Sequence, residues 1–275
     1  MRIAAALGLL AALTTARQAP PLDPIVEAAA AYVRQYQEQL TAIVADEVYK
    51  QEIKAQSPRD RAMPFKRTLQ SEIFFMFTPG QDWMAIRDVI EMDRMPVGDR
   101  PDLKNALRTL PAPQVARQFK AYNSRFNLGR VARNFNEPTF GLLVLDDRHR
   151  GRFSFERVRA QREDGEQRTV IAFRERRSPT LIADLKGGDV YSTGELTIEP
   201  RSGRVTRSVM AMTIGTVSMT MTTTYGPDAR LGIWVPLRFG EYYRDGSKTG
   251  PYYEEILCEA RYSTYRQFEV RARIR

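Results

Sequence analysis

Alternation between apolar and hydroxyl side chains over residues 217–225 is the feature that most constrains the fold of this chain. Val217, Met219, Met221 and Tyr225 fall on one face of an extended segment, and serine or threonine occupies positions 218, 220, 222 and 224. This period of two is typical of a half-buried β-strand, because successive side chains of a strand point to opposite faces of its sheet. The segment therefore predicts an antiparallel sheet with one apolar face.

Further strands are predicted on both sides of this segment. Seven strands, including the segment 217–225, are predicted after residue 150: 152–158, 169–175, 190–199, 204–214, 217–225, 233–243 and 253–265. Connections rich in Gly, Asp and Pro join them, as chain reversals require. Two earlier candidates, 69–77 and 83–92, form a hairpin around the turn 78–82. A sheet of nine strands is wide enough to curl around a helix, because a flat sheet would leave its apolar face in water.

Helices are predicted in the first half of the chain. An apolar stripe that begins at Pro24 predicts a helix over residues 24–50, followed by a solvent-facing loop over 55–66. Two short helices are predicted over 101–110 and 113–126, with Gly129 as the stop signal. Residues 139–145 form either a short helix or a buried strand, and a helix is favoured. The predicted fold class is α+β: a large, curved, half-barrel-like antiparallel sheet with an N-terminal helix and two short helices packed on it.

The first sixteen residues have the pattern of a secretory signal peptide. Arg2 precedes an apolar run of about eleven residues, which is too short to cross a bilayer, and small residues follow it. Cleavage after Ala16 leaves residues 17–275 as a single β-rich domain. We expect a periplasmic or secreted protein with no transmembrane segment in the mature chain.

The formal net charge of +9 comes from basic residues that are spread along the whole chain. A nucleic-acid site requires Lys and Arg gathered on one face, so no nucleic-acid partner is predicted. Anionic lipid headgroups and envelope proteins remain allowed as partners. No cofactor is predicted.

The chain offers few groups for catalysis or metal binding. Cys258 is the only cysteine, and it shares a strand face with Ile256, Ala260 and Tyr262, which indicates a small buried hydrophobic residue. His149 is the only histidine and lies in a charged loop beside Asp146 and Asp147, so a solvated turn is favoured over a metal site. A triad centred on His149 stays open, although no nucleophile elbow accompanies it.

Acidic residues interleave with arginines in and after the second predicted strand. Ion pairs are favoured over paired catalytic carboxylates, because basic partners keep acids ionised and poor as proton donors. The acids are Asp88, Glu91, Asp93 and Asp99, and the arginines are Arg87, Arg94 and Arg100. We therefore predict neither catalytic residues nor metal ligands.

Methionine and aromatic residues provide the only candidate ligand-binding surface. Flexible apolar side chains of this kind adapt to an acyl chain if the sheet curls around one, whereas the alternative is an ordinary core filled by the N-terminal helix. The predicted ligand-binding residues are Met210, Met212, Met219, Met221, Tyr225 and Phe239.

Two resemblances accompany these patterns. The runs Phe74-Phe75-Met76, residues 87–93 and Asn127-Leu128-Gly129 resemble an uncharacterised family of exported proteins from Acidobacteria-like bacteria, over most of the mature chain. The segment 196–205, a strand, a turn and a strand, is similar to the tail of the outer-membrane lipoprotein-carrier and lipoprotein-sorting superfamily. This second resemblance implies an unclosed β-barrel capped by helices, with an apolar cavity for acyl chains.

The favoured hypothesis is an exported, non-enzymatic protein that binds a lipid or lipoprotein acyl chain in a curved β-sheet. A cell-envelope scaffold with a filled core is the alternative, and a hydrolase that uses His149 is the third. Bound lipid would distinguish the first hypothesis from the second, and loss of activity in His149→Ala would identify the third.

Overall fold

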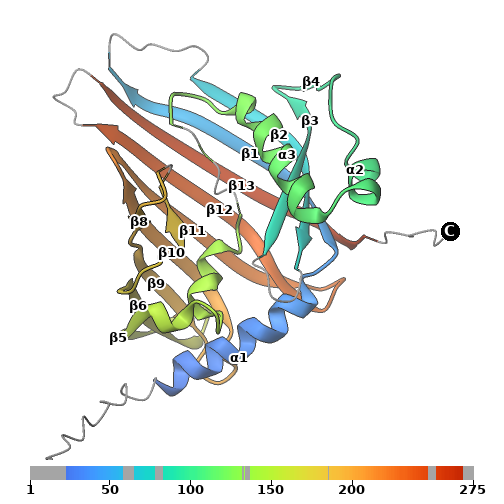
Figure 1. The fold of residues 1–275 in the computed structure, drawn as a ribbon. Helices are drawn as coiled ribbons and strands as arrows, with labels where there is room; N and C mark the ends of the chain where they lie inside the picture. The colour runs from blue at the N-terminus through green and yellow to red at the C-terminus, as the bar shows by residue number, and fades with distance from the viewer. Residues whose placement is uncertain are drawn as a thin grey trace, which may run out of the picture.

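A single antiparallel sheet of eleven strands forms most of the molecule, in the order β4-β3-β2-β1-β13-β12-β11-β10-β9-β6-β5. The computed structural model describes residues 23–57, 65–77, 83–131, 133, 137–184, 186–246 and 252–268. Within these residues the sheet is curved and open, and α1 lies across its lower end (Figure 1). The predicted α+β fold is confirmed, with eleven strands in the main sheet where nine were predicted.

The strand bounds follow the predicted pattern closely after residue 150. The strands of the main sheet are β1 (Ile43–Gln56), β2 (Lys66–Met76), β3 (Met84–Met92), β4 (Met95–Pro96), β5 (Phe153–Glu163), β6 (Glu166–Glu175), β9 (Thr193–Ile198), β10 (Val205–Ile214), β11 (Val217–Asp228), β12 (Ile233–Gly246) and β13 (Tyr253–Gln267). The short strands β7 (Ile182–Ala183) and β8 (Asp189–Val190) pair separately. The segment predicted as one strand over 190–199 is therefore split between β8 and β9.

The prediction of one helix over residues 24–50 is wrong in its second half. Helix α1 (Pro24–Gln39) begins with the Asp23 carboxylate accepting a hydrogen bond from the Ile25 amide at 2.8 Å, which caps its first turn. Ala42, at φ 54°, breaks the helical path, and β1 follows immediately. From residue 43 to residue 53 the odd-numbered side chains are all buried, which is the period of a strand.

Burial separates the two faces of the sheet. We call the face that bears Met210, Met212, Met219 and Met221 the inner face, and the opposite one the outer face. The main hydrophobic cluster joins the inner face to α1 and to the 3-10 helix η3 (Phe140–Leu145). Tyr36 of α1 packs edge-on against Trp83 at 5.6 Å between ring centroids. The N-terminal helix therefore closes one end of the inner face.

Two further helices pack on the outer face at the β3 edge. Helix α2 (Leu103–Thr109) and α3 (Ala112–Asn123) contribute to a second, smaller cluster. In it Val115 and Phe119 meet Phe74 and Ile86, which are outer-face residues of β2 and β3. The two short helices were predicted correctly.

Gly129 does not end the second of these helices, contrary to the prediction. Helix α3 ends at Asn123 and passes into the 3-10 turn η2 (Ser124–Phe126). Gly129 has φ +75° and lies beside the Glu254 carboxylate, where an added Cβ would lie 2.6 Å from Oε2. Its left-handed conformation therefore lets the chain pass close to β13.

The remaining predictions fall into two groups. The favoured helix over 139–145 is confirmed as the 3-10 helix η3. The signal peptide over 1–16, most of the loop over 55–66 and the turn over 78–82 lie outside the described residues. None of the helices in the described part of the chain has the length and apolar character needed to span a membrane.

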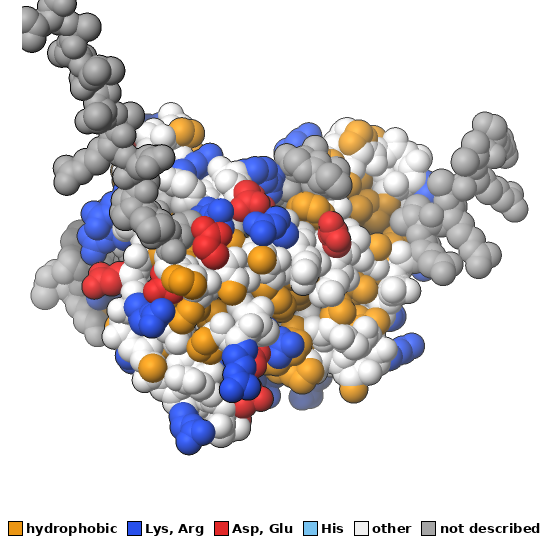
Figure 2. All heavy atoms as spheres, turned by 90° about the horizontal axis from the view of Figure 1, so that it is seen from below, with side chains coloured by type: hydrophobic (Ala, Val, Ile, Leu, Met, Phe, Trp, Pro, Cys, Tyr) orange, Lys and Arg blue, Asp and Glu red, His pale blue; other side chains and the backbone are white. Residues whose placement is uncertain are grey.

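Charged side chains are mixed over the surface that Figure 2 shows from below, with Lys and Arg among Asp, Glu and hydrophobic side chains. Three ion pairs tie α1 to distant loops and strands at this end: Arg34–Asp147, Arg150–Glu27 and Arg157–Asp23. Arginine side chains at this end are thus paired with nearby carboxylates, which fits basic residues that are spread along the chain.

Candidate functional site

Four methionines form a compact square on the inner face. Met210 lies opposite Met221 and Met212 opposite Met219 in the β10–β11 pairing, and all four belong to the main hydrophobic cluster. We call these four residues the methionine patch. Their exposed fractions are 1%, 4%, 5% and 4% in that order, so they are packed against neighbours in this structure. Their predicted contact with a ligand stays a prediction.

Tyr225 and Phe239, the other two predicted ligand-binding residues, lie on the same face but closer to α1. The Tyr225 hydroxyl donates to the Pro138 carbonyl at 2.9 Å, and its ring meets Tyr36 of α1 edge-on at 6.4 Å. Phe239 lies between Thr223 and Ala260 in the sheet register and is fully buried. The sheet therefore brings all six predicted residues onto one continuous surface.

A buried polar cluster, formed by residues of β1, β3 and β12 together with Arg133, adjoins the methionine patch. We call Glu47, Tyr49, Arg87, Arg133, Glu241 and Tyr243 the inner polar cluster. Register places Glu241 opposite Met221 and Tyr243 opposite Met219. The inner face thus changes from apolar to charged between two neighbouring strands.

An ion pair forms one side of the inner polar cluster. Arg87 of β3 donates from Nε and Nη2 to the two Glu47 carboxylate oxygens of β1, at 2.5 and 2.7 Å. The guanidinium also lies 4.6 Å from the centroid of the Tyr49 ring. Burial alone would lower the pKa of Arg87, but the Glu47 carboxylate reverses this and raises it. The Arg87 guanidinium therefore keeps its charge inside the protein.

A second carboxylate, Glu241, is held by two tyrosine hydroxyls. Tyr49 donates to one of its oxygens at 2.8 Å and Tyr243 donates to the other at 2.5 Å. Burial and then the Glu241 charge raise the pKa of both tyrosines well above the ordinary value. These hydroxyls therefore stay protonated and act as hydrogen-bond donors, not as bases.

Arg133 supplies a second buried positive charge to the inner polar cluster. Its guanidinium carbon lies 5.7 Å from the Tyr243 ring centroid, and its Nη1 donates to the Leu128 carbonyl at 2.7 Å. A second nitrogen donates to Gln51, while Nε has no hydrogen-bond partner among the described residues. A buried cation with a spare donor is a natural contact for a carboxylate or phosphate oxygen.

Cys258 lies opposite Glu241 in the sheet register and shares a strand face with Ile256, Ala260 and Tyr262, as predicted. It is fully buried, and burial followed by the Glu241 charge raises its pKa to about 12. The reactive form of a cysteine is the thiolate, which is suppressed here. The interpretation of Cys258 as a small core residue is confirmed.

Residues 147–149 around His149 form a turn in which Asp147 and Arg148 are exposed, as predicted, and Asp146 alone departs from the prediction. Asp146 is buried, where it accepts hydrogen bonds from Gln37 at 2.6 Å and from Arg148 at 2.8 Å. Burial alone would raise its pKa, but these partners lower it to about 2. Its neighbour Asp147 pairs with Arg34 and Arg150. The two aspartates thus attach this loop to α1 and stabilise the fold.

The ion-pair interpretation is confirmed with a predicted partner for Asp88 alone, and Asp93 and Asp99 pair with arginines other than the predicted ones. Asp88 lies 3.7 Å from Arg100, Asp93 lies 3.9 Å from Arg67, and Asp99 forms a double hydrogen bond with Arg125 at 2.6 Å. Asp88 departs from the expectation that such acids stay ionised. Its burial outweighs the Arg100 charge and raises the pKa of Asp88 to about 6.

Sequence reasoning missed the inner polar cluster. Glu47 was placed on a helix, where it would have faced solvent, although it alternates with buried positions 45, 49 and 51. A strand assignment for β1 would have put this carboxylate on the inner face. Arg133 gives no such signal, because it lies outside any helix or strand.

Comparison with known proteins adds likeness of fold only. No protein-family model and no curated protein matches the sequence. An outer-membrane lipoprotein-sorting protein domain from Vibrio parahaemolyticus is 10% identical with a TM-score of 0.44, covering 88% of this chain and 92% of that one. A DUF1329 family protein from Desulfovibrio piger is 13% identical with a TM-score of 0.40, covering 90% and 94%. A structure of the MucA/MucB complex of Pseudomonas aeruginosa is 8% identical with a TM-score of 0.23, covering 88% of this chain and 99% of that one.

Identities and TM-scores this low carry no argument about function. The Vibrio domain is of the class that the second sequence resemblance named. The resemblance to exported proteins of Acidobacteria-like bacteria finds no support in these comparisons.

Proposed function

We propose that this chain is an exported, non-enzymatic protein of the cell envelope that binds a lipid or lipoprotein acyl chain on the inner face of its sheet. One observation carries the proposal: the methionine patch borders the inner polar cluster, with Met221 beside Glu241 and Met219 beside Tyr243. An amphiphile has the same order of chemistry, an apolar chain joined to a polar end group.

Methionine suits such a ligand because its side chain is unbranched and flexible. Four methionines can change rotamer at little cost when an acyl chain displaces their neighbours, whereas branched side chains would resist. The tight packing of the patch means that binding exchanges protein contacts for ligand contacts. It does not require an empty cavity beforehand.

The inner polar cluster offers a binding position for the polar end of the ligand. Arg133 has a donor without a partner among the described residues, and its charge favours a carboxylate or phosphate oxygen. The two tyrosines already donate to Glu241, and Arg87 already donates to Glu47, so these side chains fix the cluster's geometry. We therefore place the ligand's polar end near Arg133 and its chain over the methionine patch.

Native mass spectrometry of the protein purified from a periplasmic fraction, followed by organic extraction, tests the proposal. The expected result is a stoichiometric lipid that leaves on extraction. A photoreactive fatty acid with a diazirine near its end should then label peptides from β10 and β11. Labelling spread evenly over the surface, or none, contradicts the proposal.

Variants on one strand separate the two faces. Met219→Asn should lower uptake of the apolar dye N-phenylnaphthylamine at least tenfold, while Met219→Leu should retain it, because volume and apolar character are kept. Thr222→Asn is the matched control, since Thr222 lies on the outer face of the same strand. Equal loss in Met219→Asn and Thr222→Asn would show that uptake is not a property of the inner face.

A scaffold with a filled core is the second candidate, and the near-complete burial of the methionine patch favours it. Under this alternative the patch is ordinary core, and the protein acts through its surface. A lipid-free mass together with no saturable uptake of dye or fatty acid would establish this alternative over the first.

A further inference from the structure

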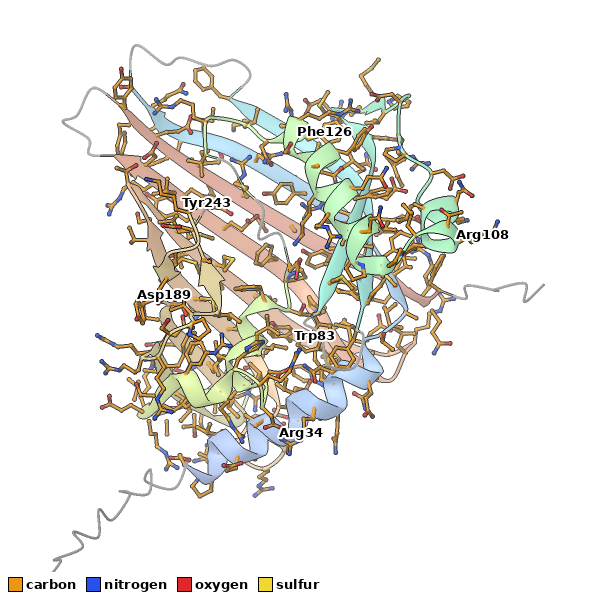
Figure 3. The ribbon with its side chains drawn as sticks, viewed as in Figure 1. Arg34, Trp83, Arg108, Phe126, Asp189 and Tyr243 are labelled. Atoms are coloured by element: carbon orange, nitrogen blue, oxygen red, sulfur yellow. The ribbon has the colours of Figure 1, made fainter. Side chains whose placement is uncertain are left out.

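A polar groove lies on the outer face, on the opposite side of the sheet from the methionine patch. It has a volume of about 630 Å³ and is lined by residues of β8, β9, β10, β11 and β12, among them Asp189, which Figure 3 labels. Met212 and Met219 also border it, although their side chains belong to the main hydrophobic cluster. Its volume lies within the roughly 300–1,000 Å³ typical of small-ligand sites.

Register shows which side chains form the floor of this outer groove. Ala211, Thr220 and Tyr242 are aligned across three strands, and Thr213, Ser218 and Arg244 form the next row. These positions alternate with Met210, Met212 and Tyr243 of the inner face, so they point the other way. The groove is thus independent of the proposed acyl-chain surface.

Two tyrosine rings stand at the groove with much of their surface in water. Tyr191 is 51% exposed and Tyr242 is 38% exposed, and both line the groove. Exposed aromatic rings beside a hollow are a common mark of a binding surface. The electron-rich face of such a ring attracts the partly positive C–H groups of a ligand that stacks on it.

The rest of the lining offers hydrogen bonds in place of apolar contact. Thr193, Thr213, Ser218 and Thr220 contribute hydroxyls, each of which can both donate and accept. Arg244 and Asp189 add one cation and one anion. Stacking rings combined with hydroxyl, guanidinium and carboxylate groups match a sugar, which presents C–H faces and many hydroxyl groups.

The charge of the groove argues against a polyanion. Arg244 is balanced by Asp189 within the lining, and Glu255 lies opposite Arg244 on β13 and hydrogen-bonds to Tyr242. A phosphate backbone is bound through several clustered Lys and Arg residues, which this lining does not have. We propose that the outer groove binds a short neutral oligosaccharide by stacking on Tyr191 and Tyr242.

Saturation-transfer NMR and calorimetry with chitotriose, cellotriose, maltotriose and mannotriose test this proposal on the full-length mature protein. At least one trisaccharide should bind saturably. Tyr191→Ala and Tyr242→Ala should each weaken that binding at least tenfold, without changing the urea midpoint, because both rings are substantially exposed. Tyr252→Ala is the matched control, since Tyr252 is also exposed but does not line the groove.

Three outcomes overturn the proposal. These are no binding of any of the four sugars, binding that survives the Tyr191→Ala/Tyr242→Ala double variant, and binding of a thymidine decamer in place of sugars. Dye uptake measured on the same variants should stay at the wild-type level. A loss of dye uptake would connect the groove to the inner face and contradict its independence.

Discussion

Replacing one residue of the buried Glu47–Arg87 pair should lower the free energy of unfolding much more than replacing both residues. Glu47 is 1% exposed and its two oxygens accept two charged hydrogen bonds from Arg87. Glu47→Leu leaves the Arg87 guanidinium buried without its counter-ion, and Arg87→Met leaves the Glu47 carboxylate buried without its counter-ion. Each single variant should lose about 3–5 kcal/mol of unfolding free energy.

The double variant Glu47→Leu/Arg87→Met should be destabilised by at most about 2 kcal/mol, because two apolar residues of similar volume replace the pair. Methionine at position 87 can also keep a sulfur contact with the Tyr49 ring. The coupling between the two substitutions should therefore be at least about 4 kcal/mol in a double-mutant cycle.

Urea unfolding followed by tryptophan fluorescence measures all four proteins. Arg125→Gln is a suitable comparison, because the Arg125–Asp99 pair has similar geometry but lies in solvent, and its midpoint should barely change. Single variants that lose less than about 1 kcal/mol, or a double variant whose loss equals the sum of the singles, would refute the reasoning.

Three further outcomes are expected. Cys258 should resist iodoacetamide at pH 8 in the folded protein and react fully in urea, as followed by mass, because burial raises its pKa to about 12. Asp88 has a folded pKa of about 6, above its ordinary value of 3.8, so the folded state binds more protons and stability should fall by at most about 2 kcal/mol as the pH rises from about 4 to about 6. Asp88→Asn should remove this fall in urea titrations at both pH values. Gly203→Ala should cost more than about 1 kcal/mol and disturb Trp83 fluorescence, because Gly203 has φ +71° and an added Cβ would lie 2.1 Å from the Ala28 carbonyl of α1; an unchanged midpoint would contradict this contact.

The strands after residue 150 could be predicted because their signals are local. Alternation in β11 and the Gly- or Asp-containing turns around it identify each reversal without knowledge of the rest of the chain. The prediction for the β1 segment failed because its signal is not local. Apolar residues at 40, 43, 44 and 48 continue the helical spacing of α1, and only the sheet partners β2 and β13 decide in favour of a strand.

The candidate site was predictable on its apolar side only. The methionine patch follows from alternation on two successive strands, which sequence shows directly. The inner polar cluster depends on pairing between residues far apart in the chain, such as Tyr49 with Glu241 and Glu47 with Arg87. The local sequence pattern does not predict such contacts, because each charged residue considered alone is expected to face solvent.

The two ends of the sheet affect how the protein can meet another chain. At one end β4 has only two residues, one of them Pro96, which lacks the amide needed to pair with an added strand. At the other end β5 carries Arg157, Arg159 and Arg162 among mostly exposed positions. An incoming strand would have to place its own side chains beside these charges. Edge-to-edge association, the usual hazard of a wide unclosed sheet, is therefore disfavoured where β4 and β5 form the edge of the sheet.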